Sequence, residues 1–315
     1  MIKLFSTLLF IIFLSSCSKS LKYPSWYLNP EKNNAQYLYG TGEGFDPEEA
    51  KYAGLSDVAS RLKVSVASKF QSAFDEDSSG ASSSISQKVS SSVEKISFNN
   101  YQILKSENTS HNTFIVLVGV ETQKLIQNYT SEINNRNEMM KKLSNLGSGI
   151  IEKRNNLAKA VSIASDIESK IRILETINSS YDSKSQFDFM NKLKDDLIKL
   201  NSQITFKVVA GNPEIESIIN YGLNKMNIGI SNGEKTTSAT IKISEQWITN
   251  YIMNSYFAKL TLNISLLDSN GKIIATKIAE TSASSTNNTE MAKKMAISKM
   301  KNEIDNKGVM SYLGL

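Results

Sequence analysis

The chain has 315 residues, of which 40% are hydrophobic and 21% are charged, and its formal net charge is +5 at pH 7. This composition is typical of a folded protein with two domains of ordinary size, or one domain with a long insertion. The lysines are scattered along the chain and are not interleaved with aromatic residues, which argues against nucleic-acid binding. The one cysteine, Cys17, lies near the N-terminus, so the body that follows can form neither a disulfide nor a thiolate metal site.

Residues 1–17 have the features of an export signal that ends in a lipid attachment site. Lys3 supplies a positive charge, and residues 4–14 are apolar but too few to span a bilayer. The run Leu14-Ser15-Ser16-Cys17 then places small residues before the cysteine. This run resembles a bacterial lipoprotein signal peptide, which implies cleavage before Cys17 and acylation of its thiol and amine. Two or more acyl chains hold a protein stably at a membrane. The alternative is an ordinary secretory signal with a chance cysteine.

Residues 18–36 form a predicted tether with an aromatic centre. Pro24 and Pro30 bracket Trp26 and Tyr27. The residue before a proline prefers extended backbone, and an aromatic side chain such as Trp26 can fasten such a segment to the face of a domain.

Residues 37–121 are predicted to form a first module. Residues 37–39 indicate a strand that ends at the run Gly40-Thr41-Gly42-Glu43-Gly44. Asp46, Pro47 and Glu49 then have the spacing of a helix start, with a capping acid, a proline at the first helical position and a glutamate three residues after the cap. One helical face follows, made of Leu55, Val58, Ala59 and Leu62.

The second half of this module is expected to complete an antiparallel sheet. The hydrophobic period changes to two over Val64, Val66 and Phe70, which predicts a strand. A polar loop, a helical stripe and two strands follow, over residues 75–84, 85–96, 101–105 and 113–121. The predicted order is strand, helix, strand, helix, strand, strand, with the helices on one face.

Residues 122–202 have no strand pattern and are predicted to form a helical hairpin or a three-helix arm. Apolar residues recur at spacings of three and four, as in coiled-coil seams, and Gly147 and Gly149 interrupt the pattern. The pattern leaves open whether the seams close within the chain or against a second copy.

Residues 203–315 are predicted to form a second module. A strand over residues 205–210 precedes a helix that begins at Asn212-Pro213-Glu214, and alternating strands and a last helix, from about Thr289 to Asp305, follow. The expected fold class is therefore α+β, with two small modules whose antiparallel sheets are packed by helices and separated by the helical arm.

Several short patterns resemble chemical motifs, but each has a simpler structural explanation. The glycine run at 40–44 has an acid at its centre and lacks the glycine spacing of a nucleotide-binding loop. The acidic stretch that starts at Asp75 has Ser86 where a calcium loop needs a glutamate. His111, the one histidine, lies in a polar turn without an orienting partner. We therefore expect no enzymatic activity, no metal and no cofactor.

Four aromatic residues are candidates for an interaction surface, namely Trp26, Tyr27, Trp247 and Tyr251. The last two lie near Tyr256 and Phe257 in the sequence, and a strand core or a subunit contact is the alternative explanation for them.

A family resemblance rests on the stretch from Pro24-Ser25-Trp26 to Pro30, on residues 37–44 and on Glu49-Ala50. These residues resemble the twenty-kilodalton surface lipoprotein family of flagellated Gram-negative bacteria, which includes outer-membrane lipoproteins of flagellar basal disks. The resemblance extends from the lipid attachment site to about Glu121. It implies an outer-membrane lipoprotein without known enzymatic activity, and the functional residue it supplies is the acylated Cys17. The helical arm and the second module depart from the family, which puts a direct transfer of the disk role in doubt.

The sequence therefore predicts an outer-membrane lipoprotein that serves as a non-enzymatic envelope scaffold or interaction module, with the flagellum as one candidate setting. Ser18 lacks the acid associated with inner-membrane retention in some bacteria. The expected partners are the membrane, through acylated Cys17, and envelope proteins, with a homo-oligomer as a further option; no small-molecule substrate and no nucleic acid is indicated. The alternative is a periplasmic accessory or regulatory subunit of a cell-wall or flagellar machine, and a hydrolase with converging carboxylates is a third class.

Overall fold

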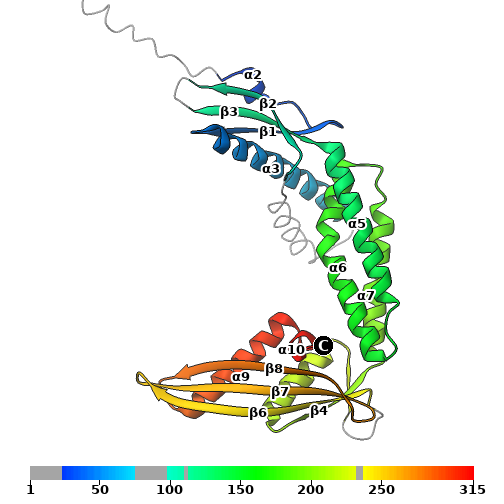
Figure 1. The fold of residues 1–315 in the computed structure, drawn as a ribbon, viewed down its shortest axis with the longest axis vertical. Helices are drawn as coiled ribbons and strands as arrows, with labels where there is room; N and C mark the ends of the chain where they lie inside the picture. Colours follow the sequence, from blue (N-terminus) through cyan, green and yellow to red (C-terminus); the bar gives the residue numbers. More distant parts are fainter. Residues whose placement is uncertain (1–22, 75–97, 110–112, 232–236) are drawn as a thin grey trace, which may run out of the picture. The chain divides into compact units, whose positions relative to one another are not determined.

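The α+β fold class is confirmed by the computed structural model, which describes residues 23–74, 98–109, 113–231 and 237–315 (Figure 1). The chain divides into two compact units. The N-terminal unit contains residues up to Asn134 together with Ile167–Ser183, and the C-terminal unit contains Asn135–Asp166 together with Lys184–Leu315. The division passes through the helical arm, so each unit includes part of it. The predicted signal peptide with Cys17, the acidic stretch, the helix at 85–96 and His111 lie outside the described residues.

The N-terminal sheet has three antiparallel strands in the order β1-β3-β2. Their bounds are Tyr37–Gly44 for β1, Tyr101–Asn108 for β2 and Phe114–Glu121 for β3. Every residue of β3 from Ile115 to Val120 is buried. This near-continuous apolar run is typical of a central strand that is covered on both faces.

Helix α3 spans Pro47–Phe74 and starts with the predicted cap. Asp46 Oδ1 accepts a hydrogen bond from the Glu49 amide at 2.8 Å, and Glu49 Oε2 accepts one from the Phe45 amide at 2.7 Å. These bonds occupy amide donors at the helix start, where the first turn has no intrahelical acceptors.

The strand predicted from Val64, Val66 and Phe70 is wrong, because α3 continues through these residues. Val66 is buried, whereas Val64 is 68% exposed. A strand would place these two valines on the same face, but a helix groups residues three and four apart. Val66 therefore joins Leu62 in the core cluster of this unit. Burial of that stripe outweighs the preference of valine for strands.

The prediction that the first strand ends at the glycine run is wrong, because β1 continues through Gly40 to Gly44. Gly40, Gly42 and Gly44 alternate along the strand and all face α3. A Cβ atom on Gly42 would lie 2.1 Å from the Ala50 carbonyl oxygen and 2.2 Å from the Gly54 amide nitrogen. The helix can approach the strand this closely only because these positions lack side chains. The glycine run therefore serves strand–helix packing.

The predicted arm consists of three helices, α5 (Thr122–Ser144), α6 (Ile150–Ile177) and α7 (Ser183–Ser202). Gly147, with a φ of +116°, lies between α5 and α6. The apolar stripes are buried in a single chain, with no more than 6% exposure at Ile133, Met140, Leu157, Ala164, Ile171, Leu174, Met190 and Leu193. The helical seams therefore close without a second copy.

The C-terminal sheet has five strands in the order β5-β4-β6-β7-β8. Their bounds are Thr205–Ala210 for β4, Gly229–Ile230 for β5, Ala239–Ile252 for β6, Ser255–Asp268 for β7 and Ile273–Ser285 for β8. The sheet is mixed rather than antiparallel throughout, because β4 runs parallel to β5 and β6. Helix α8 (Pro213–Lys225) makes the crossover that the parallel pair β4 and β5 needs.

Helices α8, α9 (Thr289–Lys307) and α10 (Val309–Leu313) cover one face of this sheet (Figure 1). As predicted, Asn212 caps α8, since its side chain accepts hydrogen bonds from the Glu214 and Ile215 amides. The core beneath the helices is built from alternate strand residues, including Ile241, Ile243, Leu260, Leu262, Ile264 and Leu266. The other face is left to polar side chains along most of β6 and β7.

Candidate functional site

A short aromatic segment, residues 23–28, lies on the face of the N-terminal sheet opposite α3 and contains the short helix α2 (Ser25–Leu28) (Figure 1). Glu43 alternates with the glycines that face α3, so its carboxylate points to the opposite side. The phenol oxygens of Tyr23 and Tyr27 each lie 3.3 Å from a Glu43 carboxylate oxygen. These contacts fasten the segment to β1.

Strand β2 holds the same segment through a second acid. The Trp26 indole nitrogen donates a hydrogen bond of 2.9 Å to Glu107 Oε1. The Tyr27 ring stacks on Tyr23, with centroids 5.1 Å apart, and meets Trp26 edge to face at 6.0 Å. The pKa of Tyr27 is raised first by burial and then by the negative charge of Glu43. A free tyrosine already has a pKa of about 10, so the Tyr27 phenol is neutral at pH 7 and can donate to Glu43.

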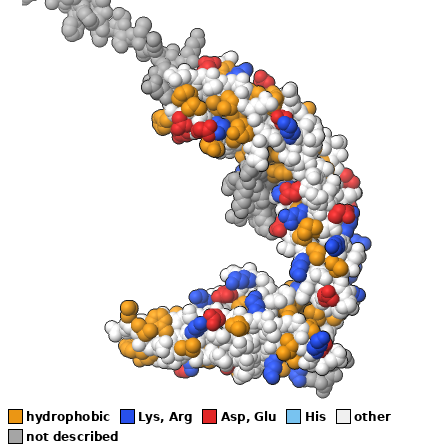
Figure 2. Space-filling model, viewed as in Figure 1, with side chains coloured by type: hydrophobic (Ala, Val, Ile, Leu, Met, Phe, Trp, Pro, Cys, Tyr) orange, Lys and Arg blue, Asp and Glu red, His pale blue; other side chains and the backbone are white. Residues whose placement is uncertain are grey.

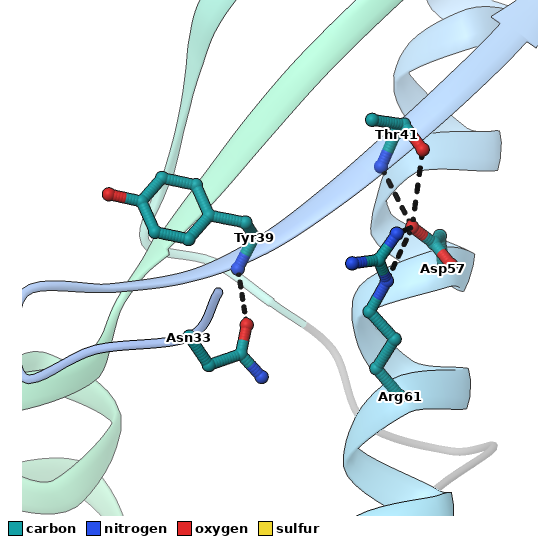
Figure 3. A network of polar contacts seen from close by, with 5 residues as sticks. All are labelled: Asn33, Tyr39, Thr41, Asp57 and Arg61. Carbon is teal, nitrogen blue, oxygen red and sulfur yellow. Dashed lines mark hydrogen bonds and ion pairs between the residues drawn. The ribbon is translucent and has the colours of Figure 1, made fainter. Parts of the chain in front are cut away.

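Side chains also occupy the outer edge of β1 (Figure 3). The Tyr39 amide donates to Asn33 Oδ1 at 2.8 Å, and the Thr41 amide donates to Asp57 Oδ2 of α3 at 2.9 Å. Arg61 holds the same carboxylate, with its Nε donating at 2.9 Å and its Nη2 2.8 Å away. These donors would otherwise be available to a strand from another chain.

The backbone amide of the first residue of β1 also has a side-chain acceptor. The Tyr37 amide donates to Asn34 Oδ1 at 2.8 Å. Amides at residues 37, 39 and 41 therefore all have side-chain acceptors, and this edge of the sheet is closed to strand addition over these residues.

The C-terminal unit exposes a different feature, the end of the β6–β7 hairpin at residues 248–257, which we call the hairpin tip. Exposed hydrophobic side chains gather there, with Met253 at the apex 93% exposed. Met253 and Asn254 form the turn with φ values of +50° and +58°. Asparagine tolerates this left-handed backbone, but a methionine in it costs about 1–2 kcal/mol.

The structure separates the four aromatic residues predicted to form an interaction surface. Trp26 and Tyr27 lie together in the N-terminal unit, where both are half-buried. Tyr251 pairs across the hairpin with Tyr256, at a centroid distance of 4.7 Å, and is exposed at the tip. Trp247 instead packs, half-buried, against the C-terminal core.

The described residues offer little that could hold a metal. Among them, no group of three or more His, Cys, Asp or Glu side chains is placed to bind a metal ion. A depression of about 450 Å³ in the N-terminal unit is lined by amide, hydroxyl and aliphatic side chains, including Asn33, Asn34 and Thr122. None of the helices in the described ranges has both the length and the apolar character needed to cross a membrane.

Residues 24–121, which comprise the aromatic segment and the N-terminal sheet with α3, match the model of the LPP20 lipoprotein family. We call residues 24–121 the LPP20 module, after the family that they match. The family resemblance that rests on Pro24 to Pro30, residues 37–44 and Glu49-Ala50 is thereby confirmed. The matched range ends where α5 begins, so the helical arm and the C-terminal sheet lie outside it.

Three solved structures are similar to this chain at low identity. The secreted protein HP1454 from Helicobacter pylori is 13% identical with a TM-score of 0.44, covering 90% of this chain and 99% of that chain. A minor lipoprotein from Acinetobacter baumannii is 13% identical with a TM-score of 0.30, covering 35% of this chain and 92% of that chain. Lipoprotein GNA1162 from Neisseria meningitidis is 15% identical with a TM-score of 0.23, covering 33% of this chain and 99% of that chain. These likenesses are too distant to indicate a function. No curated protein sequence matches the chain.

Sequence reasoning found the aromatic residues of the LPP20 module but missed the acids that hold them, Glu43 and Glu107. It also missed Asp57 and Asn33, which close the β1 edge. One signal was available, because an acid that alternates with packed glycines must face away from the helix. The long-range partners of Asp57 and Asn33 leave no such periodic signal.

Proposed function

We propose that this chain is an outer-membrane lipoprotein, anchored through acylated Cys17, that serves as a non-enzymatic interaction scaffold in the cell envelope. The observation that carries the proposal is the position of the LPP20 module directly behind the predicted anchor. Only residues 18–22 separate Cys17 from Tyr23, and a chain of that length reaches at most about 20 Å. Because Tyr23 contacts Glu43 on β1, acylation would hold the N-terminal sheet next to the membrane surface.

The surface of the LPP20 module supports a role in binding other envelope proteins. Leu28 is 62% exposed on the aromatic segment, and Phe45, just after β1, is 78% exposed. Apolar side chains held in fixed positions at a protein surface are candidate contacts for partner proteins. The closed β1 edge favours recognition through side chains over strand addition at that edge.

The anchor is tested by metabolic labelling with an alkyne analogue of palmitate, followed by separation of membrane and soluble fractions. The wild-type chain should take up the label and sediment with membranes. Cys17→Ser should lose the label and move to the soluble fraction, with Ser16→Ala as the control that keeps both. An unlabelled wild-type chain, or Cys17→Ser that stays equally in the membrane fraction, would overturn the anchor.

The assignment to the outer membrane depends on Ser18, since an acid at this position is associated with inner-membrane retention in some bacteria. Density separation of the two membranes should find the wild-type chain in the outer-membrane fraction. Ser18→Asp should shift it toward the inner membrane, whereas Ser18→Thr should not. A wild-type chain that co-sediments with the inner membrane contradicts the assignment.

The scaffold role is tested by crosslinking in intact cells, with size measurement on the soluble chain from residue 18 onward. A scaffold should form a defined oligomer or be crosslinked to several envelope proteins. A stable one-to-one complex with a single partner would instead support an accessory subunit, and a monomer without crosslinks would argue against both. The proposal does not include the flagellar disk role, because the arm and the C-terminal unit lie outside the LPP20 match.

A further inference from the structure

The hairpin tip has exposed apolar side chains on both of its faces and at its apex. Tyr251 and Tyr256 form a cross-strand pair on the face that the helices cover nearer the centre of the sheet, where Leu260 is fully buried. Ile252 and Phe257 lie on the opposite face, because successive strand residues alternate. Met253 lies at the turn between them. Figure 2 shows hydrophobic side chains gathered at this end of the C-terminal unit.

Exposed apolar side chains on both faces are better buried by a medium that surrounds the tip than by a protein that contacts one face. A protein that docks against a sheet from the side covers one face and leaves the other in water. At the tip, exposed side chains of 41% to 93% accessibility lie on both faces and the apex. Their simultaneous burial therefore needs an apolar environment that encloses the tip, which a lipid layer supplies.

The positions of the charged residues in the hairpin limit how deeply the tip could enter a lipid layer. Between Glu245 and Lys259 the chain has no charged residue. Lys259 pairs with Ile248 across the hairpin and forms an ion pair with Glu280 of β8, with an N–O distance of 2.9 Å. From residue 248 to the apex at residue 253 the strand extends roughly 17 Å, about half of a 30 Å hydrocarbon core. The tip is long enough to enter a bilayer and too short to cross it.

The side chains at the tip also have the chemistry of the membrane interface. Tyrosine has an apolar ring and a polar hydroxyl, and it is enriched where lipid meets water. Tyr251 and Tyr256 lie just behind the apolar apex formed by Ile252 and Met253, with the Tyr251 hydroxyl 3.5 Å from Asn254 Oδ1. The left-handed backbone at Met253 places a large apolar side chain at a position where glycine would be less strained.

We propose that the hairpin tip inserts into the interfacial zone of a lipid bilayer and gives the C-terminal unit a membrane contact of its own. This contact does not depend on the acyl anchor. It can therefore be tested on a chain that has no lipid.

The first test uses the chain from residue 18 onward, which lacks Cys17 and has no other cysteine. Met253→Cys introduces a single thiol for a polarity-sensitive dye, and Ile273→Cys places the same dye at an exposed position of β8 away from the tip. Vesicles of phosphatidylethanolamine and phosphatidylglycerol should shift the dye emission at position 253 to the blue and leave the dye at position 273 unchanged. No shift at position 253, or equal shifts at both positions, overturns the proposal.

The second test measures vesicle binding by flotation without a dye. Ile252→Ser with Met253→Gly should weaken binding about tenfold, since it removes two apolar side chains from the contact. The glycine suits the left-handed turn, and unchanged circular dichroism would confirm folding. Ile273→Ser with Ile274→Ser removes comparable exposed apolar surface elsewhere and should change binding less than twofold. Equal losses in the two double variants would overturn the proposal.

Two further outcomes distinguish other occupants of the tip. A blue shift at position 253 that rises with protein concentration in the absence of lipid would assign the tip to self-association. A shift with a lipid-free extract of envelope proteins and none with vesicles would assign it to a protein groove. Either result overturns the lipid proposal. Neither affects the acyl anchor, which is tested separately through Cys17→Ser.

Discussion

The two sheets of this protein differ in how much of their surface other parts of the chain cover. In the LPP20 module, α3 covers one face, the aromatic segment packs on part of the other, and Asn33, Asn34 and Asp57 close the β1 edge. In the C-terminal unit, helices cover one face only, and the long β6–β7 hairpin ends in exposed apolar side chains.

This difference shows that exposure at the hairpin tip is local and does not reflect a poor core. Phe206, Ile241 and Leu260 of the same sheet are fully buried. The turn also keeps Met253 in a strained backbone. The N-terminal sheet is thus packed by a separate segment, whereas the C-terminal sheet ends in an exposed apolar tip with a strained backbone.

The largest expected effect is at the tightest contact of the covered sheet. Gly42→Ala places a methyl group against the backbone of α3 and should destabilise the N-terminal unit by about 3 kcal/mol. The chain has one tryptophan in each unit, so Trp26 reports N-terminal unfolding by denaturant in a Trp247→Phe background.

The control, Gly149→Ala, lies in the C-terminal unit and adds a methyl group with nothing within 4 Å of it, so it is followed through Trp247. The control should leave the midpoint unchanged. Equal effects of the two substitutions would contradict close strand–helix packing.

Alkaline pH should weaken the C-terminal unit through Tyr312. Burial, with a smaller effect of Glu303, raises the pKa of Tyr312 to about 12, above the value of 10.0 for an unperturbed tyrosine. The neutral phenol therefore stabilises the fold fully below about pH 10, and this contribution of about 2–3 kcal/mol is lost as pH rises toward about 12.

The measurement follows Trp247 fluorescence during denaturant unfolding at increasing pH, in a Trp26→Phe background. Tyr312→Phe should flatten the alkaline decline of the C-terminal unit. Burial also raises the pKa of Tyr129, in the N-terminal unit, to about 12, so in a separate Trp247→Phe background the decline reported by Trp26 should persist in the Tyr312→Phe chain. An unchanged C-terminal slope would refute this role of Tyr312.

The closed edge of β1 should be sensitive to the loss of an acceptor. Asp57→Ala leaves the Thr41 amide without its partner and should cost the N-terminal unit about 2 kcal/mol. Asp57→Asn keeps an acceptor oxygen and loses only a partly exposed ion pair with Arg61, so it should cost less than about 1 kcal/mol. Denaturant unfolding followed through Trp26 compares the two, and equal costs would assign the effect to charge instead.

The smallest effect is a gain at the uncovered tip. Met253→Gly relieves the left-handed backbone and should stabilise the C-terminal unit by up to about 1 kcal/mol, measured through Trp247. Asn254→Gly should gain less, because asparagine already tolerates this conformation. A loss of stability in Met253→Gly would show that the methionine side chain supports the fold.

The strands of the C-terminal sheet were predictable because one face is buried and the other is polar. Leu260, Leu262 and Ile264 alternate with polar residues, and this period of two predicts a strand with one buried face. The parallel placement of β4 was not predictable, since pairing direction depends on the crossover through α8 and not on local pattern.

In the N-terminal unit, the spacing of the valines led to a wrong prediction of a strand. Val64 and Val66 have the spacing of a strand, yet the helical stripe that ends at Val66 decides the structure. The site was predicted only in its aromatic residues. Trp26 and Tyr251 can be picked out in the sequence because they are aromatic. The partner of Trp26, Glu107, lies 81 residues away, and the strain at Met253 exists only in the folded backbone.

The closed edge of β1 has a consequence for the lipid anchor that we propose. Confinement to a surface raises the local concentration of identical neighbours far above that in free solution, and it favours association that needs no new contact chemistry. A bare strand edge under such crowding would act as a template for runaway chain-to-chain polymerisation. With the proposed anchor, the side chains of Asn33, Asn34 and Asp57 would let many copies of the module share one patch of membrane without joining along that edge.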